Sequence, residues 1–167
     1  ESGAFLILYL HLHGQINNAV DNCRGVDQGG EYDLTHPWDE VAALTIGTLE
    51  GIDEGGSGDV QDGQLIWGLS TRRAFQFQTL NRQGYAEVNS QIEDLLFAGR
   101  GEIDALACDM LETTADSIKS LTLIPLIQSI LKYAVQNEQH SADSSSADLA
   151  LGEVYALALI PIVHFAK

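Results

Sequence analysis

The chain has 167 residues, 45% of them hydrophobic, and its 24 Asp and Glu against 8 Lys and Arg give a net charge of −16. A chain of this length can bury a sizeable core without covalent staples. Its acidity excludes nucleic acid as a partner, because binding phosphates requires clustered cations, and it disfavours anionic membrane surfaces. Two interpretations of the acidity remain: solubility in a salty or secretory medium, and a surface that collects cations.

Helical spacing of apolar residues predicts a first helix over residues 3–22. Its most apolar stretch, 5–12, is too short to span a bilayer, so we expect a core helix and a chain that is not itself transmembrane. A polar, Gly-rich connection then leads to a second helix. Thr35 is its expected N-cap, Pro37 lies in the first turn, and the helix runs through Leu49.

The Gly-rich residues 51–63 predict a loop, and residues 64–71 form a short apolar segment after it. A further helix is expected over residues 86–98. The sequence Gly99-Arg100-Gly101 is expected to close it.

Two more helices are predicted over residues 102–120 and 121–137, with one long helix bent at Pro125 as the alternative. A linker of Ser, Ala and Asp, 141–148, precedes a last helix over residues 149–165. The fold class is therefore all-α, a bundle of about six helices with almost no strand.

A weak internal repeat accompanies this pattern. Ala19-Val20-Asp21-Asn22 returns as Ala134-Val135-Gln136-Asn137, and Glu40-Val41-Ala42-Ala43-Leu44 returns as Glu153-Val154-Tyr155-Ala156-Leu157. Each copy would be a helix, a polar loop and a second helix, and two such units packed together would form a four-helix core. Chance similarity between amphipathic helices is the alternative.

The two cysteines, Cys23 and Cys108, form one disulfide in an oxidising compartment or remain as buried thiols, and the sequence leaves both open. No nucleophile elbow, phosphate-binding loop, zinc-ligand spacing or dinucleotide fingerprint occurs. We therefore expect a binding or structural protein, not an enzyme.

The most suggestive local cluster is His36-Pro37-Trp38-Asp39-Glu40. His36 and Glu40 are four residues apart and share one helical face, so both could point at one cation. The alternative is that the acidic side chains only complement the helix dipole.

Glu50 is expected at the end of the same helix, where a carboxylate opposes the dipole unless a cation compensates it. Arg72 and Arg73 are suited to forked contact with a carboxylate or a carbonate-like anion. Pairing with Glu50, Asp53 or Glu54 is the alternative for these arginines.

A secondary metal site is considered at Tyr133, Glu153 and Tyr155, because a phenolate is a good ferric ligand, although an ordinary buried tyrosine is commoner. His11 and His13 are two residues apart and lie on different helical faces, which argues against a shared metal. His164 lies four residues after Ile160 on an apolar helical face and is expected to be a core residue.

Five sequence blocks together resemble a known family. They are Trp38-Asp39-Glu40-Val41-Ala42-Ala43, Gly47-Thr48-Leu49-Glu50-Gly51, Arg72-Arg73 followed by Phe75, Leu123-Ile124-Pro125-Leu126-Ile127-Gln128 with Leu131-Lys132-Tyr133-Ala134, and Leu159-Ile160-Pro161-Ile162-Val163-His164. In this order they are similar to the Fea-type, low-iron-inducible periplasmic domain of algae, the phytotransferrin family, and more distantly to imelysin-like bacterial iron proteins.

The resemblance implies a helical domain that is secreted, periplasmic or at the cell surface and binds Fe(III) with the help of carbonate. By analogy, His36, Asp39, Glu40 and Glu50 are the candidate iron ligands, and Arg72 or Arg73 would hold the anion.

The chain also departs from the family. Leu44-Thr45 stands where the family has Phe-Tyr, and Ala74 stands where a Cys is expected. We interpret residues 1–167 as one Fea-like domain or a fragment of a longer or tandem-repeat protein. The rival function is a structural module of an extracellular filament or larger complex that keeps the fold without iron, with self-association or membership of a surface assembly.

Overall fold

The computed structural model describes residues 2–27, 30–47, 65–139 and 146–165, and within them the chain is an all-α bundle, which confirms the predicted fold class. Its helices are α1 (Ser2–Asp27), α2 (Thr35–Ile46), α3 (Ile66–Phe77), α4 (Glu87–Asp104), α5 (Cys108–Gln139) and α6 (Ser146–Phe165). Extended pairing in the described part is limited to an isolated antiparallel bridge between Leu80 and Ala86.

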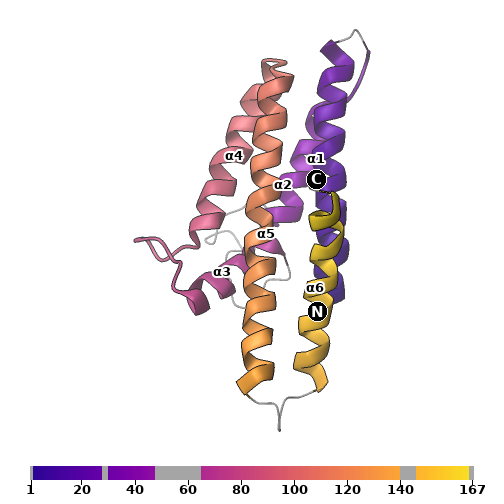
Figure 1. Cartoon of the computed structure of the whole chain (residues 1–167). Coiled ribbons are helices and arrows are strands. Elements are labelled where there is room, and N and C mark those ends of the chain that lie inside the picture. The colour runs from indigo at the N-terminus through magenta and orange to yellow at the C-terminus, as the bar shows by residue number, and fades with distance from the viewer. Residues whose placement is uncertain (1, 28–29, 48–64, 140–145, 166–167) are drawn as a thin grey trace.

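The longest helix, α5, runs the full length of the molecule (Figure 1). Helices α1 and α4 lie beside its first half, α3 packs against it lower down, and α6 returns along its second half. The two predicted helix–loop–helix units exist as the contacting pairs α1 with α2 and α5 with α6. They meet through α1, which contacts both α5 and α6, whereas α2 packs mainly on α1, α3 and α4.

One hydrophobic core joins all six helices. Trp38 is 2% exposed and lies against Gly99 of α4, where an added Cβ would come 2.0 Å from the indole atom Cζ2. The indole N–H of Trp38 donates to the carbonyl oxygen of Leu96 at 3.0 Å. Gly99 therefore lets α4 approach the tryptophan closely.

This close approach explains a wrong prediction. The sequence Gly99-Arg100-Gly101 was expected to end a helix, but α4 continues to Asp104. The break comes after it, where Leu106 adopts a positive φ of 52°. The predicted helix start at residue 102 is wrong for the same reason, because residues 102–104 belong to α4.

The alternative of one long helix through Pro125 is confirmed, since α5 is continuous. Helix α1 continues five residues past its predicted end. Its extension carries Cys23, which is fully buried and forms a disulfide with Cys108 at a Cα–Cα distance of 5.6 Å. The bond ties the end of α1 to the start of α5.

Candidate ligand sites and their geometry

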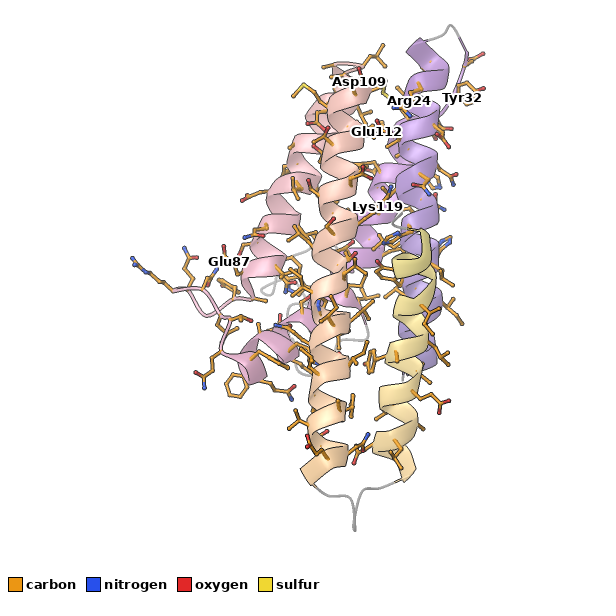
Figure 2. The ribbon with its side chains drawn as sticks, viewed as in Figure 1. Arg24, Tyr32, Glu87, Asp109, Glu112 and Lys119 are labelled. Atoms are coloured by element: carbon orange, nitrogen blue, oxygen red, sulfur yellow. A yellow bond between two sulfur atoms is a disulfide. The ribbon has the colours of Figure 1, made fainter. Side chains whose placement is uncertain are left out.

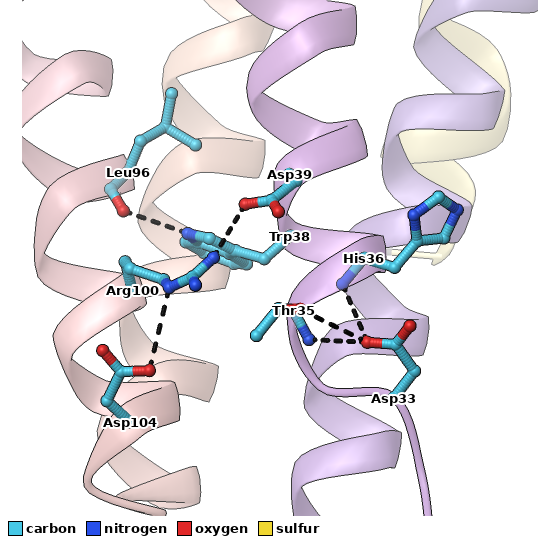
Figure 3. Close-up of polar contacts among 8 residues, drawn as sticks. All are labelled: Asp33, Thr35, His36, Trp38, Asp39, Leu96, Arg100 and Asp104. Atoms are coloured by element: carbon cyan, nitrogen blue, oxygen red, sulfur yellow. Dashed lines mark hydrogen bonds and ion pairs between the residues drawn. The ribbon is translucent and has the colours of Figure 1, made fainter.

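The start of α2 is fixed by Asp33. Its Oδ1 accepts hydrogen bonds from the backbone N–H groups of Thr35 and His36, both at 3.1 Å (Figure 3). The hydrogen bond from the His36 N–H, and to a smaller extent that from Thr35, lowers the pKa of the Asp33 carboxyl. Thr35 was predicted to be the cap, but it is the first helical residue, and Asp33 satisfies the free N–H groups instead.

The predicted iron ligands on α2 point to different neighbours. Asp39 accepts a hydrogen bond from Arg100 of α4 at 2.9 Å (Figure 3), whereas the Glu40 carboxylate lies 3.7 Å from His11 Nε2 on α1. Consecutive helical residues are about 100° apart around the axis, so Asp39 and Glu40 face different neighbouring helices. His36 is exposed on the side of α2 that faces α1 (Figure 3).

Glu50, the fourth predicted ligand, lies outside the described residues. Among those that are described, no three His, Cys, Asp or Glu side chains gather closely enough to hold a metal ion. The metal site on α2 therefore stays a prediction. The contact of Glu40 with His11 is new, because the sequence argument considered His11 only as a partner of His13.

Arg73 of α3 is the most deeply buried cation of the described chain, at 4% exposure. Its Nε donates to the Ser129 hydroxyl at 2.7 Å, and its Nη1 donates to the Gln76 side-chain oxygen at 2.8 Å. The Ser129 hydroxyl in turn donates to the Pro125 carbonyl oxygen at 2.7 Å. Within the described residues, the oxygens that accept hydrogen bonds from this guanidinium are therefore neutral.

This arrangement leaves the buried charge uncompensated within the described residues, where no carboxylate lies within ion-pair distance of Arg73. Glu50, Asp53 and Glu54, the alternative partners considered from the sequence, lie outside the described residues. A buried cation is costly unless a negative charge neutralises it. An arginine has five N–H donors, and Nη2 and half of Nη1 are not used by the two bonds above.

Tyr133 lies next to this guanidinium, and Tyr155 stacks on Tyr133. Tyr133 of α5 and Tyr155 of α6 are buried, at 8% and 3% exposure, and their rings stack with centroids 5.8 Å apart. The Arg73 Cζ lies 5.7 Å from the Tyr133 ring centroid, and Lys132 Nζ lies 5.0 Å from it on the same helix. Both cations sit over an electron-rich ring, which is a favourable placement.

The third member of the predicted secondary site is separate. Glu153 is exposed, whereas Tyr155, two residues later on α6, is buried, so they occupy different faces. Arg72 is partly buried beside Arg73. Of the predicted ligands and anion holders, the structure thus brings together Arg73, Tyr133 and Tyr155.

Thr45 stands where the family pattern has a tyrosine. It is fully buried, and its hydroxyl donates to the Val41 carbonyl oxygen at 2.7 Å. The hydroxyl is therefore used within α2. Ser129 was missed by sequence reasoning, although its place four residues after Pro125 is a usable signal, because such a serine can bond back to the preceding turn.

Comparison with protein-family models, with curated protein sequences and with solved structures gives no match to this chain. The resemblance to the Fea-type family therefore rests on the sequence blocks alone.

Residues 108–138 of α5 have the length and hydropathy of a membrane-crossing helix. A buried helix of a bundle passes the same test, so this is weak evidence for a membrane.

Proposed function

We propose that the chain is a binding domain for ferric iron that uses a carbonate-like anion, and that the binding site lies where α3, α5 and α6 meet. The observation that supports it is the buried guanidinium of Arg73, whose described hydrogen-bond partners are all neutral. A bound anion would neutralise this charge and accept two parallel hydrogen bonds from the N–H groups that take no part in the two described bonds.

The neighbouring tyrosines could supply further ligands to the iron. A phenolate oxygen can bind ferric iron directly, and iron held by tyrosine is known in proteins. Tyr133 lies beside the guanidinium, and Tyr155 of α6 stacks on the Tyr133 ring. An anion on Arg73 and phenolate ligands from Tyr133 and Tyr155 would together surround the cation with oxygen and balance its charge.

The cellular setting proposed for this activity is outside the cytosol. The disulfide Cys23–Cys108 joins α1 and α5, and such bonds persist chiefly in oxidising compartments. We accordingly propose a secreted, periplasmic or cell-surface protein.

The direct test is titration of the protein with Fe(III) in the presence and absence of bicarbonate, followed by the visible absorbance that a phenolate gives when it binds ferric iron. We expect saturable binding that requires bicarbonate. Tyr133→Phe and Tyr155→Phe should each weaken binding, and Arg73→Gln should do so by about 10- to 100-fold, the worth of a charge-assisted hydrogen bond.

Matched variants locate the site. Tyr85→Phe changes a tyrosine that is 48% exposed and should bind as the wild type does. Glu40→Gln and Asp39→Asn test the group on α2 in the same way. If Glu40→Gln abolishes binding while both tyrosine variants bind normally, the site lies between α1 and α2 instead.

The second candidate is a structural or assembly module that keeps this fold without iron. The large apolar side chains exposed on α5 and α6 favour it, among them Leu131, Leu157 and Ile160 at 50–60% exposure. Wild-type protein that binds no iron with or without bicarbonate, and is metal-free when purified from its source, would favour the module over iron binding.

A further inference from the structure

The second half of α5 exposes a regular apolar stripe. Ile127, Leu131 and Val135 follow one another at intervals of four residues and are 43%, 51% and 48% exposed. Ile124 and Ala134 extend it, so that residues 124, 127, 131 and 134 alternate spacings of three and four. This spacing is typical of a helix surface that packs against another helix. We name residues 124, 127, 131, 134 and 135 the α5 seam.

Helix α6 also exposes apolar side chains, on a face of its own. It packs against α5 and α1 and leaves three large apolar side chains exposed, at positions 149, 157 and 160. Tyr155 of α6 stacks on Tyr133 of α5, and the exposed α6 residues lie well round the helix from Tyr155, so they face away from the α5 seam. Single exposed apolar residues are ordinary on protein surfaces, but the regular series on α5 marks an interaction surface.

Charge is distributed unevenly around this surface. Residues 2–13 of α1 carry no Asp, Glu, Lys or Arg, and the remaining charges of α3, α6 and residues 120–139 of α5 are three cations and three carboxylates: Arg72, Arg73, Lys132, Glu138, Asp148 and Glu153. We call these segments the apolar half. The other described segments, the acidic half, hold the excess of carboxylates, and Figure 2 shows Asp109 and Glu112 on the part of α5 remote from the seam.

We infer that the α5 seam binds a second copy of this chain, seam against seam about a two-fold axis. A copy presents the same uncharged apolar row, so no like charges meet in the seam itself. The charge of −16 per chain opposes association elsewhere, and pairing through the neutral half keeps the two acidic halves apart. A nucleic acid or an anionic lipid surface would need an excess of cations, whereas the apolar half carries as many carboxylates as cations.

The size and charge of the surface determine how the dimer should behave. The seam is a single row of side chains on one helix, whereas a standard interface buries roughly 800 Å² per partner, so we expect a dissociation constant on the order of micromolar. Added salt screens repulsion between the acidic halves and should tighten the dimer. A dimer held by ion pairs would weaken instead.

The experiment is sedimentation velocity of the full chain over a range of concentrations, at low and at high salt. Leu131→Lys places a charge in the seam, and Met110→Lys makes the same change at a 62%-exposed residue of α5 in the acidic half. We expect a salt-strengthened wild-type dimer, a dissociation constant raised roughly tenfold or more by Leu131→Lys, and no change in Met110→Lys. Circular dichroism verifies that both variants are folded.

Three results would overturn the inference. They are a wild-type protein that stays monomeric at all concentrations, equal dimerisation of the two variants, and a monomer that co-sediments with vesicles of neutral phosphatidylcholine, which would assign the seam to a lipid surface. Iron binding by a monomer would leave the proposed function intact, because Arg73 and Tyr133 are buried and lie behind the seam's exposed row.

Discussion

The two halves of the bundle are stabilised in different ways. In the acidic half, α1 is bonded covalently to α5, Arg24 contacts Glu112 at 2.6 Å, and Arg100 joins α4 to Asp39. In the apolar half, helices are held by packing around a polar interior centred on Arg73. The comparison teaches that the carboxylates concentrate where a disulfide and ion pairs join the helices, and that the α5 seam lies in the other half.

The largest effect is expected from the disulfide. The double variant Cys23→Ala/Cys108→Ala opens a loop across 85 residues and should lower the free energy of unfolding by about 2–5 kcal/mol. Urea denaturation followed by circular dichroism measures it. Reduced wild-type protein is the control and should lose a similar amount; an unchanged midpoint in both would mean that the acidic half does not depend on the bond.

The next effect concerns the boundary between the halves, where His13 lies. Burial, reinforced by the positive charge of Lys119, lowers the His13 pKa from 6.5 to about 4. The unfolded chain therefore binds a proton that the folded chain rejects, so stability falls as the pH drops from about 6.5 towards 4 and is unaffected above that range. The loss should reach about 2 kcal/mol by pH 5.

His13→Gln removes the titrating group and with it this pH-dependent loss of stability. Urea denaturation at pH 7 and pH 5 should show a smaller difference for the variant than for the wild type. His36→Gln changes an exposed histidine and should keep the wild-type difference. Identical pH dependence in all three proteins would show that His13 does not contribute.

The smallest effect tests the close packing of the acidic half. Gly99→Ala places a methyl group against Trp38 and should destabilise by about 1–3 kcal/mol. Gly101→Ala is the matched change on the same helix, where an added Cβ meets nothing within 4 Å, and should stabilise by up to about 1 kcal/mol. The midpoint temperatures of thermal unfolding of the two variants should shift in opposite directions from the wild type. A shift of the same sign in both would contradict the packing argument.

The sequence predicted most helices but not all of their ends. Residues 64–71 were expected only as a short apolar segment, although α3 spans Ile66–Phe77, and α2 ends at Ile46, not at Leu49. Apolar spacing located α1, α2, α4 and α6, because amphipathic periodicity is a local property. It misjudged Gly99, since the reason for that glycine is Trp38, sixty-one positions earlier in the chain. It also left the state of Cys23 and Cys108 open, because their distance depends on tertiary packing.

The candidate sites were predicted by residue type but not by arrangement. Arg73 and Tyr133 were named from the sequence, and the structure places them together. Asp39 and Glu40 were expected to act jointly, but adjacent positions on a helix turn them towards different neighbours. Helical geometry alone favoured His36 with Glu40 over Asp39 with Glu40, whereas the approach of His11 from α1 required the fold.

The position of the disulfide also divides the chain topologically. Helices α2, α3 and α4 all lie between its two cysteines, inside a closed covalent ring. Helix α6 follows the ring, and its covalent connection to the ring runs through α5. Detaching α6 therefore does not require the ring to open. Partial unfolding is expected to begin with this helix, and it would expose Tyr155 while the rest of the bundle remains a single linked body.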